Sequence, residues 1–97
     1  MIYYEKHINK DSNEWVTFIH GAGGSSAIWF RQIEYFKSLF NVILVDLRGH
    51  GQSKLSHENV KNYSFKAFNQ DILEVLNKEK IEKTHLVGIS LGSIIIG

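Results

Sequence analysis

The sequence predicts an α/β fold with a short, mostly parallel sheet of about four strands and helices on its faces. Runs of β-branched, aromatic and aliphatic residues alternate with segments whose apolar residues recur at helical spacing. Glycine-rich segments directly follow several of the strand-like runs, as is typical where a strand leads into a helix. With 97 residues, the chain is expected to contain one domain at most.

Two predicted strands and a helix occupy the first forty residues. Residues 2–8 are rich in strand-forming side chains, and residues 15–20, W-V-T-F-I-H, form a second run. Ser25 or Ser26 is a candidate N-cap for the helix that follows. The predicted apolar stripe of this helix consists of Trp29, Ile33, Phe36 and Phe40.

The remaining elements follow the same alternation. Asn41 suits the left-handed residue just past a helix end, and residues 42–47 predict a strand buried on both faces. Ser64 is the candidate N-cap of a second helix that ends near Glu79. A last strand is predicted over residues 84–89, and its apolar character matches that of the other strands.

Composition excludes several classes of function. Eleven Lys and Arg against ten Asp and Glu give a net charge of +1, which favours neither a nucleic-acid partner nor a membrane partner. The absence of cysteine excludes disulfides, thiolate metal sites and a thiol nucleophile. No signal-peptide core is found, and no apolar run approaches the ~20 residues that span a bilayer. We therefore expect a cytoplasmic protein, with no metal site and no cofactor.

The strongest chemical signal is the pentapeptide G-I-S-L-G at residues 88–92. It follows a predicted strand and begins a predicted helix, which is the context that a nucleophile elbow requires. Gly88 and Gly92 would let strand and helix approach closely, with the hydroxyl of Ser90 raised above the strand end. The N–H of Leu91 would then lie at a helix N-terminus and stabilise a developing oxyanion. The alternative is a turn that only connects strand to helix.

A second signal is H-G-A-G-G-S at residues 20–25, between a predicted strand and a predicted helix. Its glycines let backbone N–H groups approach a bound oxygen closely. This arrangement suits the second oxyanion donor of an acyl-transfer site. We interpret His20 as a strand-end histidine that forms hydrogen bonds and shapes the loop, in preference to a general base.

The third signal, D-L-R-G-H-G-Q-S, covers residues 46–53 at another strand end. Its two glycines permit a tight turn, and Asp46 and Arg48 are expected to pair and hold that turn. A catalytic role for Asp46 or His50 is the less favoured alternative. The other histidines and Asp71 are interpreted as surface or local structural residues.

Taken together in this order, the three motifs resemble the first part of an α/β-hydrolase fold enzyme of the esterase-like, serine type. The resemblance covers essentially the whole chain. It implies a nucleophile at Ser90 and oxyanion donors at the backbone N–H groups of Leu91 and Ala22. It also implies that an ester, thioester, amide or carbon–carbon bond of a small acyl substrate is hydrolysed through an acyl-enzyme.

The chain departs from that family at the other two members of the catalytic triad. In the family the acid and the histidine follow the serine along the chain, whereas only seven residues follow Ser90 here. We therefore expect residues 1–97 to be the N-terminal portion of one hydrolase domain, truncated after the elbow and nearly inactive alone. The strand before Ser90 would have an open edge carrying Leu86, Val87 and Ile89, which predicts self-association.

Two other classes of function are kept as hypotheses. A glycine-rich segment after a strand, with Asp46 at the end of the next strand, is similar to a dinucleotide-binding unit. Ser26 stands where that pattern needs Gly or Ala, and the unit has no use for the pentapeptide at residues 88–92. The other hypothesis is a non-catalytic interaction module that recruits a partner through an open strand edge.

Overall fold

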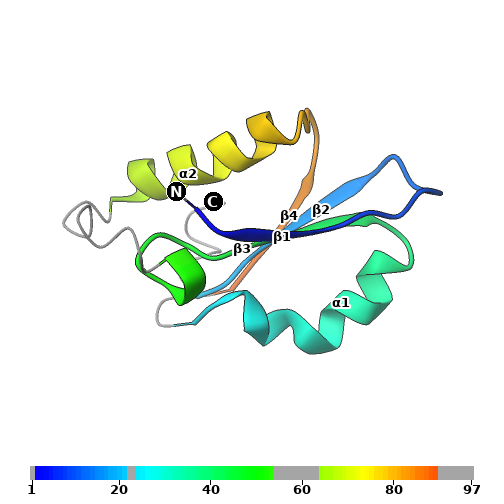
Figure 1. Cartoon of the computed structure of the whole chain (residues 1–97), viewed down its shortest axis with the longest axis horizontal. Helices are drawn as coiled ribbons and strands as arrows, with labels where there is room; N and C mark the ends of the chain where they lie inside the picture. Colours follow the sequence, from blue (N-terminus) through cyan, green and yellow to red (C-terminus); the bar gives the residue numbers. More distant parts are fainter. Residues whose placement is uncertain (1, 22–23, 54–63, 90–97) are drawn as a thin grey trace.

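The computed structural model describes residues 2–21, 24–53 and 64–89, which form a mixed four-stranded sheet between two layers of helix (Figure 1). The predicted α/β class is therefore confirmed. Residues 90–97, where the sequence predicts the start of a further helix, lie outside the described residues. In chain order the elements are β1 (Tyr4–His7), β2 (Trp15–Ile19), the 3-10 helix η1 (Ser26–Trp29), α1 (Phe30–Lys37), β3 (Asn41–Val45), α2 (Phe65–Lys78) and β4 (His85–Gly88).

The strand order in the described sheet is β1-β3-β2-β4. Strand β2 lies between β3 and β4 and runs parallel to both, so that Val16 is opposite Val42 on one side and His85 on the other. Only β1 runs antiparallel, against β3. Because β2, β3 and β4 run in the same direction, their carboxyl ends lie at the same end of the sheet, and the segments that follow them leave the sheet there. The three motifs found in the sequence all begin at the carboxyl ends of these strands.

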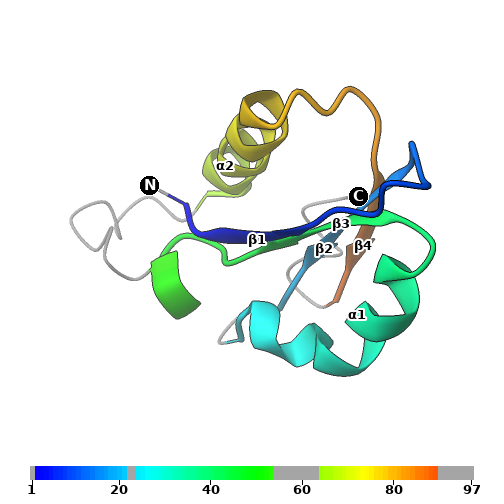
Figure 2. The ribbon, with the colours of Figure 1, turned by 45° about the vertical axis from the view of Figure 1, so that its right-hand side comes forward.

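Helices cover both faces of the sheet (Figure 2). Alternate residues of the strands pack against opposite helices, as the pleat of a strand requires. Every residue of β3 is buried, as the sequence predicted for a strand with two covered faces. The face toward η1 and α1 carries Val16, Phe18, Val42 and Leu44, packed with Trp29, Ile33, Phe36 and Phe40. The face toward α2 carries Ile19, Ile43 and Val45, packed with Phe68, Ile72, Val75 and Leu76.

The two predicted helix caps are confirmed. The Ser25 hydroxyl accepts the N–H of Ala27 and caps η1, which leads directly into α1. The Ser64 hydroxyl accepts the N–H of Ala67 and caps α2. In each case a serine in extended backbone satisfies one of the free N–H groups of a first helical turn.

The prediction for Asn41 was wrong. This residue begins β3, and within the described residues Lys80, after α2, is the one non-glycine with a positive φ. The Asn41 side chain is instead buried, and its amide donates to the Ser12 carbonyl at 2.9 Å while its oxygen accepts the Asn9 N–H at 2.6 Å. The amide side chain of Asn41 therefore holds the β1–β2 connection against the start of β3.

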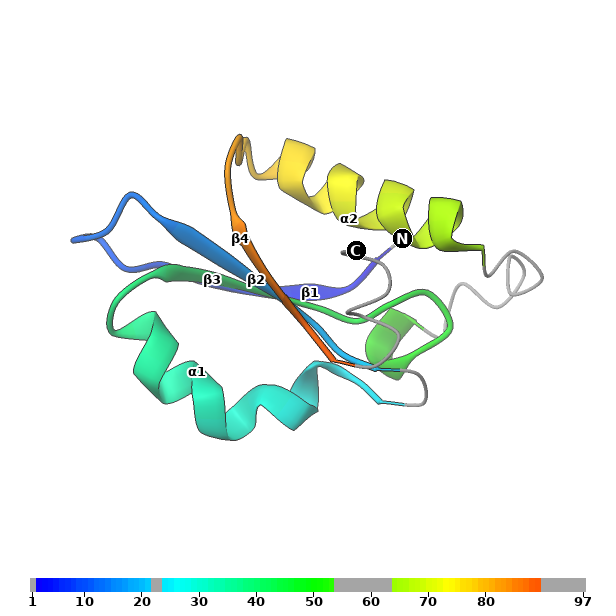
Figure 3. The same ribbon diagram turned by 180° about the vertical axis from the view of Figure 1, so that it is seen from behind.

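Strand β4 forms one edge of the described sheet, as expected from the sequence, and lies nearest the viewer in Figure 3. Leu86 is 42% exposed and Ile89 is 51% exposed, whereas Val87 contributes to the core on the α1 side. The sequence predicted an open backbone edge on this strand, and within the described sheet β4 pairs with β2 alone.

Candidate functional site

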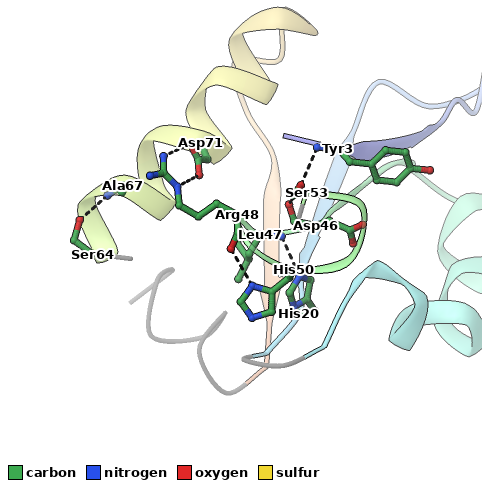
Figure 4. Close-up of polar contacts among 10 residues, drawn as sticks. All are labelled: Tyr3, His20, Asp46, Leu47, Arg48, His50, Ser53, Ser64, Ala67 and Asp71. Atoms are coloured by element: carbon green, nitrogen blue, oxygen red, sulfur yellow. Dashed lines mark hydrogen bonds and ion pairs between the residues drawn. The ribbon is translucent and has the colours of Figure 1, made fainter. Parts of the chain in front are cut away.

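The candidate site lies where the segments after β2, β3 and β4 leave the sheet (Figure 4). The pentapeptide begins at Gly88, the last residue of β4, and the N–H of Ile89 still donates to the Ile19 carbonyl of β2 at 3.3 Å. The ends of β4 and β2 therefore lie side by side. The predicted nucleophile and donors, Ser90, Leu91 and Ala22, lie outside the described residues.

His20, directly after β2, is fully buried and uses both ring nitrogens. Its Nε2 accepts the backbone N–H of Leu47 at 3.0 Å, and its Nδ1 lies 2.6 Å from the Gly21 carbonyl. A backbone N–H can only donate and a carbonyl can only accept, so the ring is neutral with its proton on Nδ1. The predicted role of His20, hydrogen bonding that shapes the loop, is confirmed, and neither nitrogen is available to act as a base.

Burial is the main cause that lowers the pKa of His20 below its ordinary value of 6.5. The neighbouring His50, whose ring centroid lies 5.1 Å from that of His20, lowers this pKa further. The Gly21 carbonyl and the carboxylate of Asp46 oppose the shift. The balance keeps His20 neutral, in agreement with its hydrogen bonds.

Asp46, directly after β3, is buried and bonds to two backbone N–H groups. Its Oδ1 accepts from Ser26, in the first turn of η1, at 2.7 Å, and its Oδ2 accepts from Gln52 at 2.9 Å. The predicted pairing of Asp46 with Arg48 was therefore wrong. The Asp46 carboxylate therefore satisfies backbone N–H groups from two loops. One of them is in the first turn of η1, where a negative charge is favourable.

Arg48 pairs instead with Asp71 of α2. Its Nε lies 2.7 Å from Asp71 Oδ2, and its second guanidinium nitrogen lies 2.8 Å from Oδ1. Asp71 is 5% exposed, so of the two roles expected from the sequence, surface residue or local structural residue, the first is wrong and the second is supported. The sequence contained a signal, because Asp71 stands three residues after Phe68 and four before Val75, on the apolar stripe of the helix. A carboxylate in that position requires a cationic partner.

The loop over residues 46–53 is held together by further bonds. The Ser53 hydroxyl donates to the Asp46 carbonyl at 2.7 Å and accepts the N–H of Tyr3 at 3.0 Å, which joins the loop to the segment before β1. Gly51 has a φ of +49°, and a Cβ there would lie 2.4 Å from Asp46 Oδ2. This turn therefore requires glycine both for its backbone conformation and for space.

These contacts bear on the dinucleotide-binding hypothesis. In such a unit the acid after the second strand binds a ribose hydroxyl. Here Asp46 is 2% exposed, and both of its oxygens are bonded to backbone N–H groups. The arrangement does not fit a ribose contact.

Among residues 2–21, 24–53 and 64–89, no three His, Asp or Glu side chains are grouped to hold a metal ion. No helix in these ranges is long and apolar enough to cross a membrane. A cavity of about 630 Å³ lies at the amino ends of β2 and β4, away from the motif loops. It is lined by Asn13, Glu14, Trp15, Glu82, Lys83, Thr84 and His85.

Comparison with known proteins gives consistent similarities. The model of the alpha/beta hydrolase fold family matches residues 14–97. The 3-oxoadipate enol-lactonase 1 of Acinetobacter baylyi is 33% identical over 79 residues, which are 81% of this chain and 28% of that protein. The (E)-2-((N-methylformamido)methylene)succinate hydrolase of the same bacterium is 32% identical over 89 residues, which are 92% of this chain and 33% of that protein.

Solved structures agree with the sequence relatives. A structure from work on the carboxylesterases of Nitrososphaera gargenis superposes with a TM-score of 0.81 at 32% identity. The superposition covers 98% of this chain and 34% of that one. The chain thus spans about a third of the length of the relatives it matches.

Proposed function

This chain belongs to the alpha/beta hydrolase fold family, and on that premise we propose that it carries the nucleophile and the oxyanion donors of a serine hydrolase. Ser90 is the proposed nucleophile, and the backbone N–H groups of Leu91 and Ala22 are the proposed donors. The substrate is a small molecule with a carboxylic ester as its reactive group. This class is favoured because one relative is named an enol-lactonase, a lactone being a cyclic ester, and a structural neighbour comes from work on carboxylesterases.

The observation that carries this proposal is the alignment of the ends of β2 and β4. The hydrogen bond from Ile89 to Ile19 brings the residue before Ser90 beside the end of β2, from which the His20–Gly24 segment departs. A nucleophile in the segment after β4 and an N–H donor in the segment after β2 would therefore start from neighbouring strand ends. This supports a site in which attack by Ser90 is followed by stabilisation of the oxyanion.

In the proposed reaction, Ser90 Oγ attacks the ester carbonyl and gives up its proton while the oxyanion forms. Collapse of this intermediate breaks the ester C–O bond, and the departing oxygen takes up the proton that Ser90 gave up and leaves as the alcohol. Water then hydrolyses the acyl-enzyme. The proton needs an acceptor. His20 has both nitrogens occupied. His50, beside it, bonds through Nδ1 to the Arg48 carbonyl and not to a carboxylate of the kind that orients a triad histidine. His7 and His85 lie at the other end of the strands, opposite Val42 and Val16. We therefore propose that this chain alone turns over slowly, because a serine without an adjacent base is a weak nucleophile.

Reaction with a fluorophosphonate, followed by intact mass, tests the proposal. We expect slow formation of one adduct at Ser90, because oxyanion donors alone retain roughly 10³–10⁴-fold catalysis over water. Added imidazole should accelerate the reaction by supplying the missing base. Ser90→Ala should abolish the adduct, and Ser38→Ala, which removes an exposed hydroxyl at the end of α1, should not change it.

Two results would contradict the proposal. The first is an adduct that persists in Ser90→Ala, which would assign the reactivity to another residue. The second is a folded chain that forms no adduct even with imidazole, which would indicate an elbow without hydrolytic function.

A further inference from the structure

The Gly21 carbonyl is held from two sides. Nδ1 of the His20 imidazole donates to it at 2.6 Å, and the N–H of Gly24 donates to it at 3.1 Å. A Cβ on Gly24 would lie 3.3 Å from the same oxygen, so the loop folds closely around it. The imidazole is itself fixed through Nε2, which accepts the Leu47 N–H from the segment after β3.

A fixed carbonyl also fixes the N–H of the next residue. The peptide group is planar, and in the trans form its C=O and N–H point in opposite directions. Because the imidazole and the Gly24 N–H hold the Gly21 carbonyl, they also restrict the plane of the peptide to which this carbonyl belongs. The proposed oxyanion donor, the N–H of Ala22, belongs to this peptide.

We propose that His20 is a positioning residue, which acts as a neutral imidazole protonated at Nδ1 and orients the donor N–H of Ala22 through the Gly21 carbonyl. This inference rests on the proposed function. His20 itself does not touch the substrate. It transmits the position of the β3 end, through Leu47, to the loop after β2.

The neutral form is essential to this role. A second proton, on Nε2, would face the N–H of Leu47, and two donors cannot share a hydrogen bond. The titratable groups that face the ring are His50, which lowers the pKa of His20, and Asp46, which raises it. Both come from the segment after β3. The fully buried position of His20 further disfavours the charged form.

Two variants separate the two hydrogen bonds of His20. In His20→Asn the side-chain amide ends near the position of Nδ1 and can still donate to Gly21. In His20→Gln the amide ends near the position of Nε2 and can still accept from Leu47. His85→Gln is the matched control, because His85 begins β4 at the end of the strand away from the motif loops. For each protein we would measure the rate of fluorophosphonate labelling at Ser90 and the hydrogen exchange of the Gly24 and Leu47 amides.

We expect His20→Gln to keep the Leu47 amide protected and to lower the labelling rate by up to roughly 10²–10³-fold, which is the cost of losing one oxyanion donor. His20→Asn should retain protection at Gly24 and most of the labelling rate. The ¹⁵N spectrum of the wild-type imidazole should show the Nδ1-protonated tautomer. Equal labelling rates in the two variants, or the opposite tautomer, would overturn the inference.

The proposed function can fail separately. If Ser90 does not label in the wild-type chain, the proposed function is contradicted, whereas the tautomer and the exchange of Gly24 still report on His20. Loss of Gly24 protection in His20→Gln but not in His20→Asn would then support the control of the Gly21 carbonyl by His20. Equal protection in both variants would contradict it.

Discussion

Asp46 and Gly51 face each other across the loop that follows β3, and a Cβ on Gly51 would lie 2.4 Å from Asp46 Oδ2. The close approach lets the carboxylate accept the N–H of Gln52 while it also holds Ser26 of η1. One buried side chain thereby connects the loop after β3 with the helix that follows the glycine-rich segment. Substitutions at this contact should disturb both loops together.

We expect Gly51→Ala to lower the free energy of unfolding by about 2 kcal/mol or more, since the left-handed conformation alone disfavours a side chain by roughly 1–2 kcal/mol. The added methyl group must also displace Asp46. Urea unfolding followed by circular dichroism would measure the change. In an Asp46→Ala background the effect of Gly51→Ala should be smaller, because the clash is removed. Additive effects would contradict a direct contact between the two residues.

The pair formed by Arg48 and Asp71 should be strongly coupled. Their side chains are 19% and 8% exposed, so the removal of one partner leaves a largely buried charge. We expect Asp71→Asn to lower the free energy of unfolding by about 1–3 kcal/mol. The double variant Arg48→Met/Asp71→Asn should lose less than the sum of the two single changes.

An exposed ion pair provides the control for this measurement. Lys37 and Glu34 of α1 lie 2.9 Å apart with side chains 41% and 74% exposed. Glu34→Gln should change the free energy of unfolding by at most about 0.5 kcal/mol. A comparable loss in Asp71→Asn and Glu34→Gln would argue against a special role for the buried pair.

The low pKa of His20 predicts that acid destabilises the fold. Below about pH 6.5 the unfolded chain binds a proton that folded His20 does not, so stability falls as the pH is lowered, by at most about 1.4 kcal/mol per pH unit. Hydrogen bonds from Lys6 and Tyr4 lower the pKa of Glu79. The stability that these bonds provide is lost only when the pH falls below 4.5, the ordinary pKa of Glu79. Urea unfolding at about pH 5, 6 and 7 covers the histidine window.

His20→Asn has no imidazole at this position and should therefore show a weaker loss of stability in the same window. His85→Gln should retain the wild-type pH dependence, because His85 is exposed and lies at the amino end of β4, away from His20. An unchanged slope in His20→Asn would assign the acid sensitivity to another group.

The predicted self-association through β4 can be tested by light scattering coupled to size exclusion. Leu86 is 42% exposed at the edge of the described sheet, and a lysine at such an edge opposes strand pairing between molecules. We expect Leu86→Lys to shift the chain toward the monomer. Leu73→Lys, which removes an exposed apolar residue of α2, should have little effect. A wild-type monomer over the accessible concentration range would refute this prediction.

Local patterns predicted the secondary structure well. The strands and caps depend on neighbouring residues, so the apolar runs and the serines Ser25 and Ser64 were sufficient to find them. The partners of Asp46, Arg48 and Asn41 depend on which segments meet in space, and their positions in the sequence do not contain that information. Arg48 stands two residues from Asp46 but pairs with a carboxylate on α2. The assignments of Ser90, Leu91 and Ala22 stay predictions.

The strand order has a consequence for the order of folding during synthesis. Strand β2 pairs with β4 through Val16 and His85, which are far apart in the sequence, whereas β1, β2 and β3 are all made earlier. As the chain leaves the ribosome, a three-stranded sheet with α1 on one face can form first. Until residues 85–88 emerge, β2 is the edge strand and its unpaired backbone can bind another nascent chain. The slowest and most error-prone step is therefore expected to be the docking of β4 onto β2, because distant pairings form late.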